Sequence, residues 1–238
     1  MTKRTDGPTL RSILWLCAWA ILILQIYFAL HILVWTVTAP SSTAFMRAGQ
    51  LRILRSGDDV PWQHEWVPYD GISPWLKRAV VASEDATFLT NDGVDWKAIH
   101  EAWIKNHSLR DERLHRVVGG STITQQLAKN LFLSPQRSYV RKAQELLLAY
   151  MLEGILGKRR ILEIYLNSVE WGEGIYGANA AAQHYFHQPA SRLSHFQAAR
   201  LAVMLPAPRF FEHHLFGPYI DARTGVIAAR AYQVQIPR

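Results

Sequence analysis

The longest apolar run of the chain stands at its N-terminus. Residues 12–46 contain no Asp, Glu, Lys or Arg, and most of them are apolar. Such a run is long enough to cross a bilayer core of about 30 Å as a helix. We therefore expect a cytoplasmic tail at residues 1–11 and a single transmembrane helix at residues 12–38. A cleaved secretory signal, which has a shorter apolar core, is the alternative, and residues 39–42 resemble a cleavage site only weakly.

Helical periodicity begins again at residue 73. Ser73 and Pro74 are residue types favoured at the N-cap and the first position of a helix, and this helix carries Glu84 and Asp85 near its C-terminal end. There the helix dipole raises the energy of a carboxylate. The pair is therefore either a solvated helix end or an acid whose pKa is raised for general acid–base chemistry. Asp95 then predicts the cap of a second helix.

Residues 116–130 combine a glycine pair with the start of a helix. Thr122 and Gln125 have the spacing of a capping box, which predicts that a helix begins here. Backbone N–H groups released by the glycines, together with the helix dipole, suit an anion, and Lys129 adds a positive charge. Taken alone, the pattern also fits an ordinary capped helix after a loop.

Later helices are predicted by periodicity, caps and glycine breaks. The clearest amphipathic pattern covers residues 138–154. Arg141 and Glu145 stand four residues apart on it, which by itself indicates a surface ion pair. The apolar stripe expected to be buried is Val140, Ala143, Leu147, Tyr150 and Met151. Further helices are expected at residues 158–167, 178–186, 194–205 and 219–232, the third of these from a capping box of Ser194 and Gln197.

Other segments lack helical periodicity. Residues 39–72 are expected to form a stalk, with short strands at residues 51–55 and 62–67. Residues 105–116 are dense in charge and poor in core-forming side chains, so we expect an exposed, mobile flap. Residues 171–177 predict a loop punctuated by glycines.

The charge changes what kind of partner is expected. The chain has 26 Lys and Arg against 19 Asp and Glu, a formal net charge of +7. A basic domain tethered to a membrane favours an anionic partner, either lipid head groups or a phosphate-bearing substrate. Nucleic acid is not expected, because no recognised binding motif accompanies the charge. The single cysteine, Cys17, lies in the apolar run, so the globular part at residues 73–238 has no disulfide.

Five motifs stand in order along the globular part. Together they resemble the peptidoglycan glycosyltransferases of the lysozyme-like family, glycosyltransferase family 51, over roughly residues 45–215. The string from Gly119 to Gln126 is highly specific. The resemblance implies a mainly α-helical, lysozyme-like domain of the monofunctional biosynthetic form, without a transpeptidase domain. The motifs are Glu84-Asp85-x-x-Phe88…Gly93-Val94-Asp95; Gly119-Gly120-Ser121-Thr122-Ile123-Thr124-Gln125-Gln126-Leu127-Ala128-Lys129-Asn130; Arg137…Arg141-Lys142-x-x-Glu145; Lys158-x-x-Ile161-Leu162-Glu163-x-Tyr165-Leu166-Asn167; and Gly172…Gly174…Tyr176-Gly177…Ala180-Ala181-x-x-Tyr185-Phe186.

The resemblance also implies a reaction and a place in the cell. Lipid II would be polymerised into β-1,4-linked glycan strands with release of undecaprenyl diphosphate. The partners would be lipid II, the nascent glycan strand, the membrane, and other proteins of cell-wall synthesis and division. The location would be the inner membrane, with the catalytic domain in the periplasm. Basic residues flank the apolar run on both sides, so the positive-inside rule does not decide this orientation alone. No cofactor is required, although a divalent cation, Mg or Mn, is compatible with the diphosphate.

Roles follow from position in the motifs. Glu84 would be the general base that takes a proton from the acceptor hydroxyl, and Glu145 the second essential carboxylate, which orients the donor and its phosphates. Glu163 would stabilise the helix pair rather than take part in the reaction. Asn91 stands where the family usually has His, so a proton-carrying role at that position is in doubt. The expected substrate-binding residues are Asp85, Ser121, Gln125, Gln126, Lys129, Arg137, Arg141 and Lys142.

Two other functions stay open from the residues. A lysozyme-like lytic glycosidase would share the fold and the catalytic glutamate, but its uncharged leaving group would not need the basic cluster. A catalytically silent, membrane-anchored scaffold of the cell wall is the non-enzymatic alternative, and Asn91 is its only support in the sequence.

Overall fold

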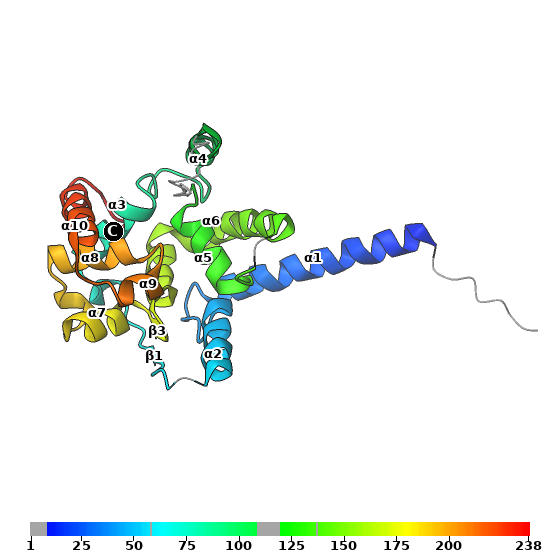
Figure 1. Cartoon of the computed structure of the whole chain (residues 1–238). Coiled ribbons are helices and arrows are strands. Elements are labelled where there is room, and N and C mark those ends of the chain that lie inside the picture. The colour runs from blue at the N-terminus through cyan, green and yellow to red at the C-terminus, as the bar shows by residue number, and fades with distance from the viewer. Residues whose placement is uncertain (1–8, 58, 109–119, 137) are drawn as a thin grey trace, which may run out of the picture.

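The first helix of the described residues is long and extends away from the rest of the protein (Figure 1). The structure is a computed structural model that describes residues 9–57, 59–108, 120–136 and 138–238. Helix α1 covers Leu10–Val34, and the Thr9 side chain caps it by accepting from the Ser12 N–H at 3.3 Å. By length and composition, α1 is able to cross a membrane. Most of the tail predicted at residues 1–11 lies outside the described residues.

The segment after α1 is helical, where a strand was predicted. Helix α2 covers Ala44–Ser56, so the strand expected at residues 51–55 is wrong. Both ends of α2 are capped: Thr43 accepts from the Met46 N–H at 3.1 Å, and Gly57 ends the helix with a φ of 74°. A threonine N-cap and a left-handed glycine define a helix between them more strongly than the short apolar run favours a strand.

Among the described residues, most of the buried apolar core lies on five helices. They are α3 (Pro74–Glu84), α5 (Ile123–Phe132), α6 (Tyr139–Ser168), α8 (His195–Met204) and α10 (Pro218–Ala231). Helix α5 packs on α6, and α3, α8 and α10 pack on one another. The predicted N-cap Ser73 and both predicted capping boxes are present. The break at Gly157, with a φ of 72°, divides α6 into the two predicted helices.

The face of α6 that packs inward is not the predicted one. Among the residues of the predicted stripe, Val140, Ala143, Leu147 and Tyr150 are exposed. The buried face carries Glu145, Leu148, Ala149 and Leu152 instead. Apolar side chains surround this helix almost completely between residues 146 and 152, so periodicity alone did not select a face. Glu145 is charged, and its carboxylate is buried in ion pairs with Arg141 and Lys142.

A small sheet and short helices complete the domain. Strands β1 (Gln63–His64), β2 (Glu170–Gly172) and β3 (Ile175–Tyr176) lie in the order β1-β3-β2, with β1 parallel and β2 antiparallel to β3. Only part of the strand predicted at residues 62–67 is in the ladder, and the predicted loop at residues 171–177 contains a hairpin. The remaining elements are η1 (Tyr69–Gly71), α4 (Trp96–Ser108), α7 (Ala178–Phe186), η2 (Ala190–Arg192) and α9 (Pro208–Glu212).

The predicted flap begins inside a helix. Helix α4 continues to Ser108, so residues 105–108 are helical. The rest of the predicted flap lies outside the described residues. The domain is mainly α-helical, as expected.

Candidate active site

Glu84 is the last residue of α3 and lines a pocket of about 180 Å³. Its side chain is half-buried. Burial raises the pKa of the Glu84 carboxyl above its usual range, against the lowering effects of hydrogen bonds from Gln126 and Ser83 and of the Lys129 charge. The two donors approach at 2.9 Å (Gln126 Nε2) and 3.3 Å (Ser83 Oγ). A carboxyl that is partly desolvated and held by donors is suited to accept a proton.

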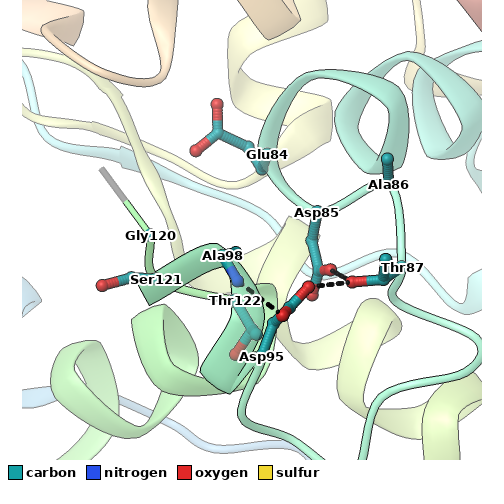
Figure 2. Close-up of a pocket in the computed structure, with 9 residues that line it drawn as sticks. All are labelled: Glu84, Asp85, Ala86, Thr87, Asp95, Ala98, Gly120, Ser121 and Thr122. Atoms are coloured by element: carbon teal, nitrogen blue, oxygen red, sulfur yellow. Dashed lines mark hydrogen bonds between the residues drawn. The ribbon is translucent and has the colours of Figure 1, made fainter. Parts of the chain in front are cut away.

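Asp85, the next residue, has a different environment. Asp85 is only 6 % exposed. Its carboxylate accepts from the Ile123 N–H at 3.1 Å, the Thr87 hydroxyl at 3.1 Å and the Asn91 amide at 2.9 and 3.2 Å. Figure 2 shows Asp85, Thr87 and Asp95 joined on one side while the Glu84 carboxylate points away from them. Burial raises the pKa of Asp85, and these donors lower it. Protein donors therefore occupy this carboxylate, which connects the end of α3 to the start of α5.

Asn91 is one of the residues that hydrogen-bond to the Asp85 carboxylate. Its amide nitrogen donates to Asp85, while its carbonyl oxygen accepts from the Gly93 N–H at 3.0 Å and from Lys158 Nζ at 3.1 Å. Lys158 also forms an ion pair with Glu153 at 2.7 Å. An amide can both donate and accept here without a change of charge. Asn91 therefore connects Asp85 to Gly93 and Lys158 through the two ends of its amide.

The start of α5 forms another wall of the pocket. The capping box is complete: the Thr122 hydroxyl accepts from the Gln125 N–H at 3.1 Å, and Gln125 Oε1 accepts from the Thr122 N–H at 3.0 Å. Gly120 lies against the backbone of α4, where an added Cβ would stand 2.8 Å from the Ala98 carbonyl oxygen. The second glycine is therefore needed for close packing, and it places Ser121 at the pocket.

A buried carboxylate gathers two cations beside Ser121. Glu145 is 3 % exposed, and its two oxygens accept from Arg141 Nη1 at 2.9 Å and Lys142 Nζ at 2.5 Å. Lys142 also donates to the Ser121 hydroxyl at 3.3 Å. The predicted pair of Arg141 and Glu145 is confirmed, but it is a buried cluster with a second cation rather than a surface pair. The net charge of the three side chains is +1.

The structure brings most of the predicted site residues together. Glu84, Asp85 and Ser121 line one pocket, Gln126 contacts Glu84, and Lys129 lies close enough to lower the pKa of Glu84. Gln125 is fully buried in the capping box, which is a structural place rather than a place on the pocket wall. Arg137 lies outside the described residues. Glu163 pairs with Arg160 at 2.9 Å.

Two contacts to the site were not expected from the sequence. Lys158 reaches Asn91, and the Tyr165 hydroxyl donates to Gln126 at 3.0 Å. Both residues stand in the fourth motif, but the motif alone assigned neither of them a role at the site. The signal that could have found Tyr165 is its hydroxyl: a fully buried tyrosine needs a hydrogen-bond partner.

Comparisons with known proteins identify relatives of this chain. A family model described as transglycosylase matches residues 53–231. A biosynthetic peptidoglycan transglycosylase of Burkholderia thailandensis is 55% identical over 213 residues, which cover 90% of this chain and 82% of the relative. A protein of the same name from Burkholderia ambifaria is 52% identical over 238 residues, 99% of this chain and 95% of the relative. The chain therefore belongs to the transglycosylase family.

Proposed function

We infer that this chain is a peptidoglycan glycosyltransferase, which polymerises lipid II into β-1,4-linked glycan strands in cell-wall biosynthesis. The observation that carries this inference is a carboxyl of raised pKa, Glu84, in one pocket with Ser121, against which Lys142 and its buried partner Glu145 are placed. A base and a cluster of fixed cations are what a transfer from a diphosphate requires. The relatives are named biosynthetic peptidoglycan transglycosylases, and we infer from these names that the polymer is peptidoglycan.

The proposed chemistry begins at the acceptor sugar. A sugar hydroxyl is a weak nucleophile at neutral pH, so Glu84 takes the proton of the acceptor 4-hydroxyl as its oxygen attacks the anomeric carbon of the donor. The bond between that carbon and the diphosphate oxygen breaks, and its electron pair leaves with undecaprenyl diphosphate. The configuration inverts from α to β, as in inverting glycosidases with the acceptor sugar in place of water.

The proposed role of the cations is to stabilise the leaving diphosphate. Negative charge grows on this group in the transition state, and cations that are already fixed stabilise it without reorganisation. Lys129, Arg141 and Lys142 are assigned this role, together with Arg137 from the sequence. Because Arg141 and Lys142 bind both oxygens of Glu145, we assign Glu145 the positioning of these cations rather than a contact with the reacting atoms. Asp85 and Gln126 position the base, and Ser121 contacts the donor.

The proposed reaction needs no cofactor, since side chains supply the base and the positive charge. Within the described part of the chain, no group of three or more His, Cys, Asp or Glu side chains is arranged to hold a metal ion. A Mg or Mn ion held by the substrate diphosphate is compatible with the same residues. Polymerisation assayed with EDTA and with added Mg or Mn measures that contribution.

We propose that α1 anchors the enzyme in the inner membrane as a single span, with the domain in the periplasm. Both substrates keep polyprenyl chains in the bilayer, so the active site must stay at its surface. Support comes from the contact between α1 and α6, where Gln25 and Gln144 exchange two hydrogen bonds of 3.1 and 2.9 Å. This pair keeps α6 beside the anchor.

The exposed face of α6 supports the same placement. Val140 and Leu147 are 82 % and 42 % exposed on it, and on α4 the Trp103 side chain is 58 % exposed. Trp96 Nε1 donates to the Tyr150 hydroxyl at 3.1 Å, which joins the two helices. Exposed apolar side chains beside a membrane helix are suited to the lipid interface. Contacts with other proteins of cell-wall synthesis and division stay a prediction.

The function is tested with fluorescent lipid II and the full-length protein in detergent. The expected product is a glycan polymer that a muramidase degrades, formed with one undecaprenyl diphosphate for each bond. Degradation of purified cell walls without polymer formation would support the lytic glycosidase. Neither activity from well-folded protein would support the scaffold.

A further inference from the structure

The Glu84 carboxylate is the end of a short chain of hydrogen bonds that starts in the core. The Tyr165 hydroxyl on α6 donates to Gln126 Oε1 at 3.0 Å, and Gln126 Nε2 on α5 donates to Glu84 Oε2 at 2.9 Å. Tyr165 is fully buried. These three side chains therefore connect helices α3, α5 and α6. Both hydrogen bonds are donated in the direction of the Glu84 carboxylate.

We propose that Tyr165 is a positioning residue for the reaction: it orients the Gln126 amide so that its N–H group is fixed on the base Glu84. This inference rests on the proposed function, in which Glu84 takes the acceptor proton. It adds a residue that makes no contact with the substrates and acts through Gln126.

The orientation of the amide follows from what each group can do. A glutamine side chain has an oxygen that accepts and a nitrogen that donates, and an ionised carboxylate only accepts. Among the described residues, Gln126 is the one hydrogen-bond partner of the Tyr165 hydroxyl. If the amide turned over, its nitrogen would face Tyr165, and the buried tyrosine hydrogen would lose its acceptor. Leaving a buried donor without a partner is unfavourable, so Tyr165 selects the orientation that serves the ionised base.

The two hydrogen bonds in series also couple Tyr165, Gln126 and Glu84 electrostatically. Hydrogen bonds in series polarise one another in a medium of low dielectric, so the donor that Glu84 receives is stronger than an isolated amide. The titratable and charged groups that face Glu84 are Asp85 on the same turn, Lys129 on α5 and Tyr165 on α6. Asp85 raises the pKa of Glu84, whereas Lys129 and the Gln126 hydrogen bond lower it.

The test is the pH dependence of kcat/KM for lipid II polymerisation by full-length Tyr165→Phe. Loss of the hydroxyl weakens the bond that Glu84 receives, so Glu84 holds its proton to a higher pH and the acid limb of the profile moves upward. At neutral pH we expect about a tenfold fall in kcat/KM, the effect of weakening one hydrogen bond to a charged group. Tyr69→Phe is the matched control, because the Tyr69 hydroxyl donates to the Pro237 carbonyl at 2.7 Å, outside the site. It should leave the limb unchanged.

A double variant separates positioning from general loss of packing. If Tyr165 acts through Gln126, Gln126→Leu combined with Tyr165→Phe loses no more activity than Gln126→Leu alone. An unmoved acid limb in Tyr165→Phe, or losses that multiply in the double variant, would overturn the inference. Glu84→Gln is measured beside them. Full polymerisation by that variant would refute Glu84 as the base and the inference with it, whereas an inactive Glu84→Gln with an unmoved limb in Tyr165→Phe refutes the inference alone.

Discussion

Replacing Glu145 by glutamine should disorganise the cation cluster without changing the shape of the side chain. Both carboxylate oxygens are engaged, at 2.9 Å with Arg141 and 2.5 Å with Lys142, and the Glu145 side chain is buried. The amide keeps one acceptor and brings a donor toward a cation. Two positive charges then stand together without their shared counter-charge.

The cost is set by how far the two cations reach water. Removing one partner of a fully buried pair costs about 3–5 kcal/mol. The Lys142 side chain is 40 % exposed and that of Arg141 16 %, so water recovers part of this cost and we expect about 2 kcal/mol. For a domain of this size, that corresponds to a fall of about 4–8 °C in the unfolding temperature.

Thermal unfolding in detergent, followed by tryptophan fluorescence, measures the loss of stability, and lipid II polymerisation measures the loss of activity. Polymerisation should fall by about two orders of magnitude, as when one fixed donor to a developing anion is removed. The control is Asp221→Asn, which neutralises a carboxylate whose side chain is 52 % exposed in its pair with Arg200 and should change either quantity little. If Glu145→Gln matched this control in both measurements, Glu145 would not position the cations.

Three further predictions concern the pocket, its pH dependence and the membrane face. Gly120→Ala should lower stability by about 1–3 kcal/mol and reduce polymerisation, because the new Cβ meets the α4 backbone. The control is Gly154→Ala, which has open space around the added Cβ and should change neither quantity. Equal losses of thermal stability in the two variants would contradict this prediction. Burial raises the pKa of Glu84, so the folded protein keeps this proton where the unfolded chain has lost it. The contribution of Glu84 to the free energy of unfolding therefore falls as pH rises from the ordinary glutamate pKa of about 4.3 through the raised pKa of the folded protein. The wild type should lose activity on the acid side at a pH above about 4.3. An acid limb of the pH–rate profile at or below that value would show that Glu84 is not desolvated. Leu147→Glu should reduce polymerisation in liposomes more than in detergent, whereas Phe196→Glu, exposed on α8, should not distinguish the two media.

Local signals predicted the helices well. Ser73 with Pro74, Thr122 with Gln125 and Ser194 with Gln197 each start a helix in the structure, because a cap is decided by neighbours in the sequence. Tertiary contacts decided the rest. The buried face of α6 contains Glu145, which is stable inside because Arg141 and Lys142 neutralise it, and apolar periodicity carries no information about such a cluster.

The site divides in the same way. From the motifs we predicted a common site, and the structure places its residues in one region: Glu84, Ser121, Gln126, Lys129 and Lys142. The contacts that hold the base were not predictable, since they join residues far apart in the chain. Tyr165 and Gln126 are one example, and Lys158 with Asn91 is another. The structure also explains the amide at Asn91, because its nitrogen donates to Asp85 and its oxygen accepts from Lys158.

The assignment of Glu84 as the general base is tested most directly by polymerisation of fluorescent lipid II with Glu84→Gln beside the wild type. The variant keeps the size of the side chain and cannot take a proton at neutral pH. We predict polymer from the wild type and none from Glu84→Gln, with both proteins folded by circular dichroism. Polymer at similar rates from both would contradict the account and move the base to another residue.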